Sequence, residues 1–263
     1  MFIANLWMIA AATLVLVLAS IEGGFRLGRA ARARSEGEKE APVSAITGTI
    51  LALLAFIMAL TFSIVSDRYD ARKALVREEA NVIRTAWLRS EFLPEPSRGE
   101  AATLLRQYVD SRLLAVQSRD IAQVETTAVE SLRLQRRLWD IAVANARNDM
   151  NSDVAALYIE SLNDLGNVHA SRVAVGMHAR IPPGIWLAFY ALVVFSMFGV
   201  GYHAAITGSR RSWMMLILAL SISLVITLIG AVDRAQGSLL SVSQQPLEDV
   251  QVMMSGRVDA TSR

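Results

Sequence analysis

The segment 77–85, which reads Arg-Glu-Glu-Ala-Asn-Val-Ile-Arg-Thr, holds the densest group of side chains that could do chemistry. Two carboxylates, an amide and two guanidinium groups within about two and a half helical turns suit a buried polar network, or a contact for a small ligand or ion. A network that locks helices together is the simpler interpretation. Catalysis by the two carboxylates is unfavourable, because adjacent helical residues point about 100° apart. The candidate residues are Glu78, Glu79, Asn81 and Arg84.

No other pattern indicates catalysis or metal binding. His169 and His178 match no metal-binding spacing, and we expect both on the surface or at helix ends. The chain has no cysteine, which excludes thiol chemistry and zinc–thiolate sites. It also lacks a glycine-rich phosphate loop and a G-x-S-x-G nucleophile elbow. We therefore expect no catalytic residue, no metal and no cofactor, and the chain is not predicted to be an enzyme.

The segment 77–85 lies in a charged insert that follows the second of four predicted membrane spans. Four stretches with uncharged interiors cover about 2–21, 43–66, 183–205 and 212–232, and each has the roughly 20 residues that cross a hydrocarbon core. The loop 22–40 between the first two is basic. The insert 67–180 carries sixteen basic and sixteen acidic residues, so it stays outside lipid, and its zero net charge argues against nucleic-acid binding. The predicted fold class is an all-α integral membrane protein with four transmembrane helices (2 + 2) and a helical extramembrane domain between spans two and three.

Local signals divide the insert into helices. Pro94 and Pro96 end the helix that continues from span two, and Ser97-x-x-Glu100 has the form of a capping box for the next one. Ser152 or Asp153 is expected to cap a later helix. Helical spacing predicts a buried face in the third and fourth helices. Its residues are Val129, Leu132, Trp139 and Val143 in the third helix, and Val154, Leu157, Ser161, Leu165 and Val168 in the fourth. The tail 233–263 is predicted to contain one short helix near 246–254.

Small side chains form a stripe at helical spacing in two of the spans. Such stripes let backbones approach closely in lipid, where packing drives helix association. Three interpretations stay open: packing within one subunit, an interface between subunits, or the narrow wall of a pore. The residues are Gly48, Ala52, Ala55, Ala59 and Ser63 in span two, and Ala219, Ser223 and Thr227 in span four.

Within the two membrane hairpins, charged side chains are confined to the span ends and loops. Asp, Glu, Lys and Arg are missing from the span interiors, which argues against a proton-coupled carrier and leaves a passive pathway with a neutral constriction. Arginines crowd the short loops 22–40 and 203–212, and the positive-inside rule assigns such loops to the cytoplasm. We therefore expect the short loops to be cytoplasmic and the helical domain extracytoplasmic, in a bacterial inner membrane.

Several motifs, taken in order, resemble the bacterial bestrophin-like family of four-span membrane proteins. The resemblance runs from about span two to Val250, and its most specific part is the acidic run followed by Leu-Pro-Glu-Pro. The motifs are Asp67-Arg68-Tyr69-Asp70-Ala71-Arg72, Glu78-Glu79-Ala80-Asn81, Arg84-Thr85, Leu93-Pro94-Glu95-Pro96, Asn163, Arg172, Ile181-Pro182-Pro183, and the tail residues Asp233 and Arg234 with Gly237, Val242-Ser243 and Pro246-Leu247.

Bestrophins are pentameric anion channels with a helical domain between spans two and three, so the resemblance implies a homo-oligomeric pore permeable to small anions. The alternative is a membrane-anchored interaction or sensing module whose helical domain binds a partner or ligand through the segment 78–85. Bestrophins often continue Asp-Arg with Pro-Phe, whereas this chain has Ala235-Gln236 and no acidic run for a calcium clasp, so calcium gating is not implied. Bestrophin domains lie in the cytosol, opposite to the orientation expected from charge. Membrane lipid and further copies of the chain are the expected partners.

Overall fold

The computed structural model describes residues 2–34, 40–117, 121–175, 181–208, 213–234 and 241–256. Every regular element in these ranges is a helix, which confirms the all-α prediction. The chain divides into two compact units, Met1–Tyr69 with Arg180–Ser241, and Asp70–Ala179 with Val242–Arg263. The helices are α1 (Phe2–Arg34), α2 (Glu40–Ser90), α3 (Ser97–Gln117), α4 (Ile121–Asn148), α5 (Asp153–Val173), α6 (Pro183–Ile206), α7 (Trp213–Arg234) and α8 (Gln245–Met254).

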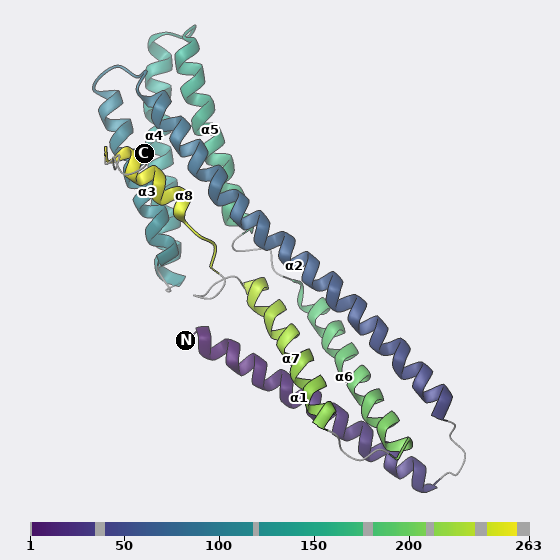
Figure 1. The fold of residues 1–263 in the computed structure, drawn as a ribbon. Coiled ribbons are helices and arrows are strands. Elements are labelled where there is room, and N and C mark those ends of the chain that lie inside the picture. The colour runs from purple at the N-terminus through teal and green to yellow at the C-terminus, as the bar shows by residue number, and fades with distance from the viewer. Residues whose placement is uncertain are drawn as a thin grey trace, which may run out of the picture. The chain divides into compact units, whose positions relative to one another are not determined.

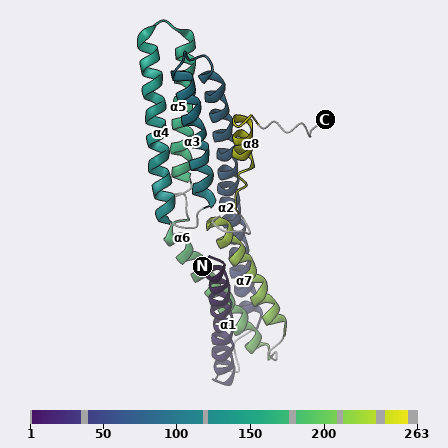
Figure 2. The ribbon, with the colours of Figure 1, turned by 90° about the vertical axis from the view of Figure 1, so that its left-hand side faces the viewer.

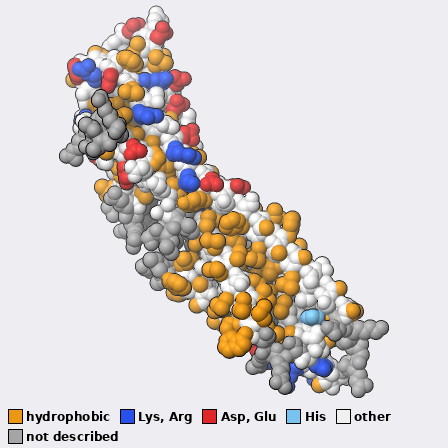
Figure 3. Space-filling model, viewed as in Figure 1, with side chains coloured by type: hydrophobic (Ala, Val, Ile, Leu, Met, Phe, Trp, Pro, Cys, Tyr) orange, Lys and Arg blue, Asp and Glu red, His pale blue; other side chains and the backbone are white. Residues whose placement is uncertain are grey.

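The first unit contains α1, the first part of α2, α6 and α7 (Figure 1). These four helices are long and apolar enough to cross a membrane, which confirms the four predicted spans. Hydrophobic side chains dominate the surface of this unit, as expected where lipid replaces water (Figure 3). Its core is formed by Val17, Leu54, Val65, Phe189, Val193, Met197, Ile226 and Ile229.

Glycines bring the backbones of α1 and α6 into direct contact. A Cβ on Gly24 would overlap the carbonyl oxygen of Phe198, and one on Gly201 would overlap that of Ile21. Such close approach is the usual role of small residues between membrane helices. It also explains a difference from the predicted loop 22–40: α1 continues to Arg34, because its glycines pack against a neighbour and do not end the helix.

The second unit is a bundle of α3, α4 and α5 with the last part of α2 and α8 (Figure 2). α3 packs against α4, and α4 against α5. Ser152 caps α5 and accepts a hydrogen bond from the amide of Ala155 at 3.2 Å, as predicted. At α3 the predicted cap differs, because the amide of Gly99 donates to the carboxylate of Glu95, which precedes the helix. The core includes Val76, Ile83, Leu104, Leu105, Tyr108, Leu134, Leu138, Tyr158 and Leu165.

The apolar face predicted for α4 is wrong in part, whereas the one predicted for α5 is mostly confirmed. In α4 the buried side chains include Leu134 and Leu138, whereas Val129 and Leu132 are 68% and 55% exposed. Trp139, also predicted for this face, is partly buried against the core. In α5 Leu165 is buried but Leu157 is 42% exposed; Val154 at the start of α5 is equally exposed, while Ser161 and Val168 are buried as predicted. Apolar residues occur on more than one face of each helix, so periodicity alone could not select the inward one.

The short tail helix α8 packs against α3. The guanidinium Nε of Arg106 donates to the backbone carbonyl of Met254 at 3.1 Å, and the side-chain Nε2 of Gln251 donates to Asp110 Oδ1 at 2.6 Å. Leu247 is fully buried in the same contact region. The tail helix predicted near 246–254 is therefore part of the second unit.

Candidate functional site

The carboxylate of Glu79 is completely buried in the second unit and lies at the centre of a polar network. Its Oε1 accepts a hydrogen bond from Tyr108 Oη at 3.0 Å and another from Arg112 Nε at 2.9 Å. Its Oε2 accepts from Arg172 Nη1. A buried charge is tolerated when it is paired and fully hydrogen-bonded, and Glu79 meets both conditions.

The contacts connect Glu79 on α2 with four other parts of the chain. Tyr108 Oη accepts from Gln135 Nε2 at 3.2 Å and lies 3.1 Å from His169 Nδ1. Because the single phenolic proton goes to Glu79, His169 Nδ1 carries the proton in its own contact with Tyr108. Arg172 Nη2 donates to Gln244 Oε1 at 3.3 Å. We call this set the Glu79 network; its members are Glu79 (α2), Tyr108 and Arg112 (α3), Gln135 (α4), His169 and Arg172 (α5), and Gln244 beside α8.

Burial controls protonation in the Glu79 network. It lowers the pKa of His169 to about 4, with a further contribution from the charge of Arg112, so the imidazole is neutral at pH 7. Burial also lowers the pKa of Arg172 to about 10, which leaves the guanidinium protonated, and it lowers the pKa of Arg112 and raises that of Tyr108. One carboxylate therefore faces two guanidinium groups, and the network carries a net charge of one positive unit.

Among the four candidate residues in the segment 77–85, Glu79 alone is buried. Glu78, Asn81 and Arg84 are exposed, and Arg84 Nη2 donates to Asn81 Oδ1 at 3.0 Å in a local surface contact. The reason is the 100° rotation between successive helical residues, which turns Glu78 outward when Glu79 points inward.

The partners of Glu79 come from distant helices and were missed from sequence. Arg172 lies 93 positions away and Arg112 lies 33 away. His169, expected on the surface or at a helix end, lies near the end of α5 but is only 3% exposed, so the surface alternative was wrong. His178 lies outside the described residues. One signal was present: Arg112 lies four residues after Tyr108 on the apolar face of α3, where a charge needs a buried partner.

The two stripes of small residues have different surroundings in the single chain. In α7, Ala219 and Ser223 are buried and Thr227 is half-buried, so this stripe packs inside the first unit. In α2, all five stripe residues, Gly48, Ala52, Ala55, Ala59 and Ser63, are exposed. The helix instead buries the face that carries Leu54 and Val65. The α2 stripe is thus a surface of the chain and not part of its internal packing.

Asp233 joins three elements of the first unit. Its Oδ1 accepts a hydrogen bond from the amide of Ile181 at 3.3 Å, just before α6, and lies 3.8 Å from Arg68 Nη1 of α2. Asp233 is only 7% exposed, and its carboxylate connects the end of α7 to α2 and to the residue before α6. The side chain of Arg234, predicted alongside it, lies outside the described side chains.

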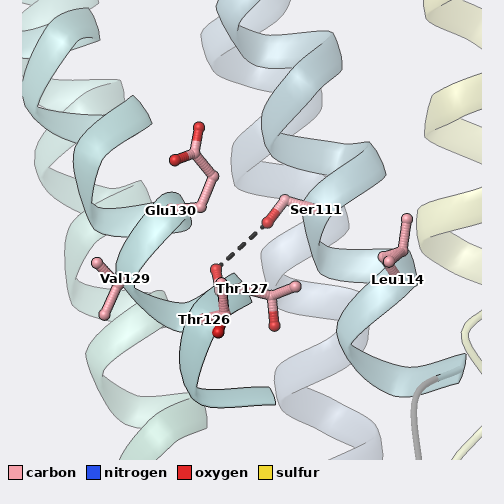
Figure 4. Close-up of a pocket in the computed structure, with 6 residues that line it drawn as sticks. All are labelled: Ser111, Leu114, Thr126, Thr127, Val129 and Glu130. Carbon is pink, nitrogen blue, oxygen red and sulfur yellow. Dashed lines mark hydrogen bonds between the residues drawn. The ribbon is translucent and has the colours of Figure 1, made fainter. Parts of the chain in front are cut away.

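A shallow pocket of about 550 Å³ opens between α3 and α4 (Figure 4). Leu114 and Val129 supply apolar surface, and Ser111 donates to the carbonyl of Thr127 at 3.3 Å across it. Its one carboxylate, Glu130, is paired with Arg133 at 2.9 Å. Within the described parts of the chain, no three His, Asp or Glu side chains gather so as to hold a metal ion. This pocket offers little specific chemistry.

Comparisons with known sequences and with solved structures both find similarity to bestrophin-like proteins. A sequence model of the Bestrophin-like domain matches residues 11–247. The solved structure of a mutant bacterial bestrophin homolog from Klebsiella pneumoniae superposes with a TM-score of 0.65 at 13% identity, covering 96% of this chain and 100% of that chain. Another structure of that homolog gives a TM-score of 0.63 at 14% identity, covering 95% and 98%. No curated protein matches this chain. At such identities the structural likeness shows the fold.

Proposed function

Because this chain belongs to the Bestrophin-like family, we propose that it assembles with further copies of itself around a pore that passes small anions across the membrane. Two properties of the chain support this function. Its spans have neutral interiors, which suit passive permeation. Its second helix exposes a row of small side chains that no helix covers within the described part of the chain.

The proposal depends mainly on the exposed small residues of α2. A row of glycine, alanine and serine leaves room along the helix for an aqueous path, and it lets the same helix of neighbouring copies approach closely. The adjacent exposed face of α2 is different, because Leu53, Phe56 and Leu60 are 49%, 59% and 45% exposed. Large apolar side chains are suited to lipid contact, so the two faces favour different neighbours: lipid for one, further copies and water for the other.

The orientation in the membrane follows from arginine distribution. Arg26, Arg29, Arg32 and Arg34 lie in the last part of α1, and Arg210 and Arg211 lie between spans three and four. Basic residues beside short connections favour the cytoplasmic side. The proposed topology therefore has cytoplasmic short connections and an extracytoplasmic second unit.

Particle images of the detergent-solubilised protein, combined with anion flux in liposomes, test the proposed function. We expect a ring of copies with an axial hole and a chloride flux that depends on the protein. Ala59→Trp should reduce this flux strongly, because the indole would fill the path, while the assembly remains intact. Leu53→Trp, on the lipid-facing side of the same helix, is the matched control and should leave the flux unchanged.

A monomer that carries no flux would instead favour the interaction or sensing module. In that case the exposed Glu78, Asn81 and Arg84 would be the contact for a partner, and alanine at these positions would abolish partner capture without loss of folding.

A further inference from the structure

The last part of α1 leaves the hydrocarbon core as a helix and enters the lipid headgroup layer. Its uncharged part, Phe2–Ile21, rises about 30 Å at 1.5 Å per residue, which is the thickness of a hydrocarbon core. Arg26 lies about 7.5 Å further along the axis, near the outer edge of the headgroup layer. The end of α6 lies at the same level, because a Cβ on Gly208 would overlap the guanidinium group of Arg32. Trp213, which starts α7 shortly after, is 82% exposed, as is usual for tryptophan at a membrane interface.

Contact with α6 determines which face of this part of α1 points outward. A Cβ on Gly24 would overlap the carbonyl oxygen of Phe198, and one on Gly28 would overlap that of Tyr202. Both glycines therefore point at α6, which runs beside α1 (Figure 1). Arg26 is two residues, or about 200°, from each glycine around the helix, so it points away from α6. Its side chain is 77% exposed.

Two more arginines lie on the same outward face. Arg29 is about 60° from Arg26 around the helix, and Arg34 is about 80° from Arg26 in the other direction. Both are exposed. One acid shares this face, because Glu22 accepts a hydrogen bond from Arg26 Nε at 2.7 Å. The next acids in the sequence come only after Arg34. With three arginines and one acid, the face carries two net positive charges.

The direction of α1 brings these side chains back toward the membrane. In an α-helix every Cα–Cβ bond tilts toward the N-terminus, and the N-terminal part of α1 is the part inside the hydrocarbon core. The long arginine side chains can therefore reach from the helix end to the level of the lipid phosphates, while the helix itself is held in place by its close contact with α6.

We propose that the face formed by Arg26, Arg29 and Arg34 binds the phosphate groups of anionic phospholipids such as phosphatidylglycerol. Arginine suits this partner, because its planar fork of donors matches pairs of phosphate oxygens. A zwitterionic phospholipid carries an ammonium group of its own, so the net positive charge of the face favours an anionic headgroup over it. All of these residues belong to the first unit, and lipid binding by them does not require a pore.

Native mass spectrometry of the detergent-solubilised full-length protein tests this site, in titrations with phosphatidylglycerol and with phosphatidylcholine. We expect phosphatidylglycerol to bind more tightly. Arg29→Gln/Arg34→Gln leaves the pair of Glu22 with Arg26 in place, and it should weaken the tightest phosphatidylglycerol binding by about 25-fold, since each basic residue near an anionic surface contributes about fivefold. Binding of phosphatidylcholine should not change. Arg29→Lys/Arg34→Lys keeps the charge and should keep most of the preference.

Arg136→Gln is the control for loss of an arginine elsewhere, since that side chain on α4 is 76% exposed; it should leave the preference unchanged. Equal binding of the two lipids by the native protein would overturn the inference, and so would unchanged phosphatidylglycerol binding by the double glutamine variant. If that variant does not fold, Arg34→Gln alone replaces it, with an expected loss of about fivefold.

Inorganic phosphate distinguishes a lipid site from a site for free anions. Added at the concentration of the lipid, it should not displace phosphatidylglycerol, because a free ion lacks the acyl chains that hold the headgroup beside α1. Displacement at equal concentration would show a site for free phosphate and would overturn the assignment to lipid.

Discussion

At the scale of single residues, the burial of Glu79 makes the most specific prediction about stability. Glu79→Gln removes the carboxylate that pairs with both Arg112 and Arg172, so two buried guanidinium groups lose their shared counter-charge. We expect a loss of about 3 kcal/mol or more in unfolding free energy, as for other broken buried ion pairs. Thermal unfolding of the solubilised protein, followed by tryptophan fluorescence, measures it. Glu78→Gln changes an exposed neighbour and should be nearly neutral.

His169 predicts a dependence of stability on pH. Burial lowers its pKa to about 4 in the folded protein, against about 6.5 in the unfolded chain. Between these values the unfolded state binds a proton that the folded state does not, so stability is full above about pH 6.5 and falls as the pH drops toward 4. The contribution is on the order of 3 kcal/mol.

Unfolding midpoints measured from pH 7.5 to pH 4 test this contribution. His169→Gln keeps a donor for Tyr108 and does not titrate, so its midpoint should fall less steeply over this range. Parallel curves for the two proteins would contradict the assignment.

At the scale of elements, the contact between α1 and α6 depends on glycine at the crossing. Gly201→Val places three carbons where the carbonyl of Ile21 already lies, so the helices must separate. We expect severe loss of folded protein in detergent, by size-exclusion chromatography. Gly230→Ala is the control: a Cβ there meets no atom within 4 Å, and alanine favours the helix. Equal yields of the two variants would show that the crossing tolerates separation.

The elements also show where sequence reasoning succeeds. The presence of each helix and the positions of its ends depend on residues within a turn or two. Pro94 ends one helix and Ser152 caps another. Which face of α4 is buried does not depend on local sequence. Val129 and Leu134 are equally apolar, and only packing against α3 and α5 decides that Leu134 is the buried one. The continuation of α1 past Gly24 likewise depends on α6.

At the scale of the whole molecule, orientation in the membrane is the prediction with the widest consequence. In the topology that we propose from the positive-inside rule, the short connections are cytoplasmic, so alkaline phosphatase fused to the C-terminus should be active. A cytoplasmic reporter such as green fluorescent protein at the same position should then be dark. The reverse pair of results would give this chain the cytosolic domain that the resemblance to bestrophins implies.

Hydropathy and charge, which depend on composition over about 20 residues, were enough to predict a four-span, all-helical membrane protein with a helical insert. The segment 77–85 was also recognisable as unusual from its residue types. Which of its carboxylates is buried, and by what it is paired, was decided only by tertiary structure, because Arg112, His169 and Arg172 reach Glu79 from helices far away in the sequence. Tertiary structure also distinguished the two small-residue stripes: their composition is alike, but one has a neighbour within the chain and the other faces outward.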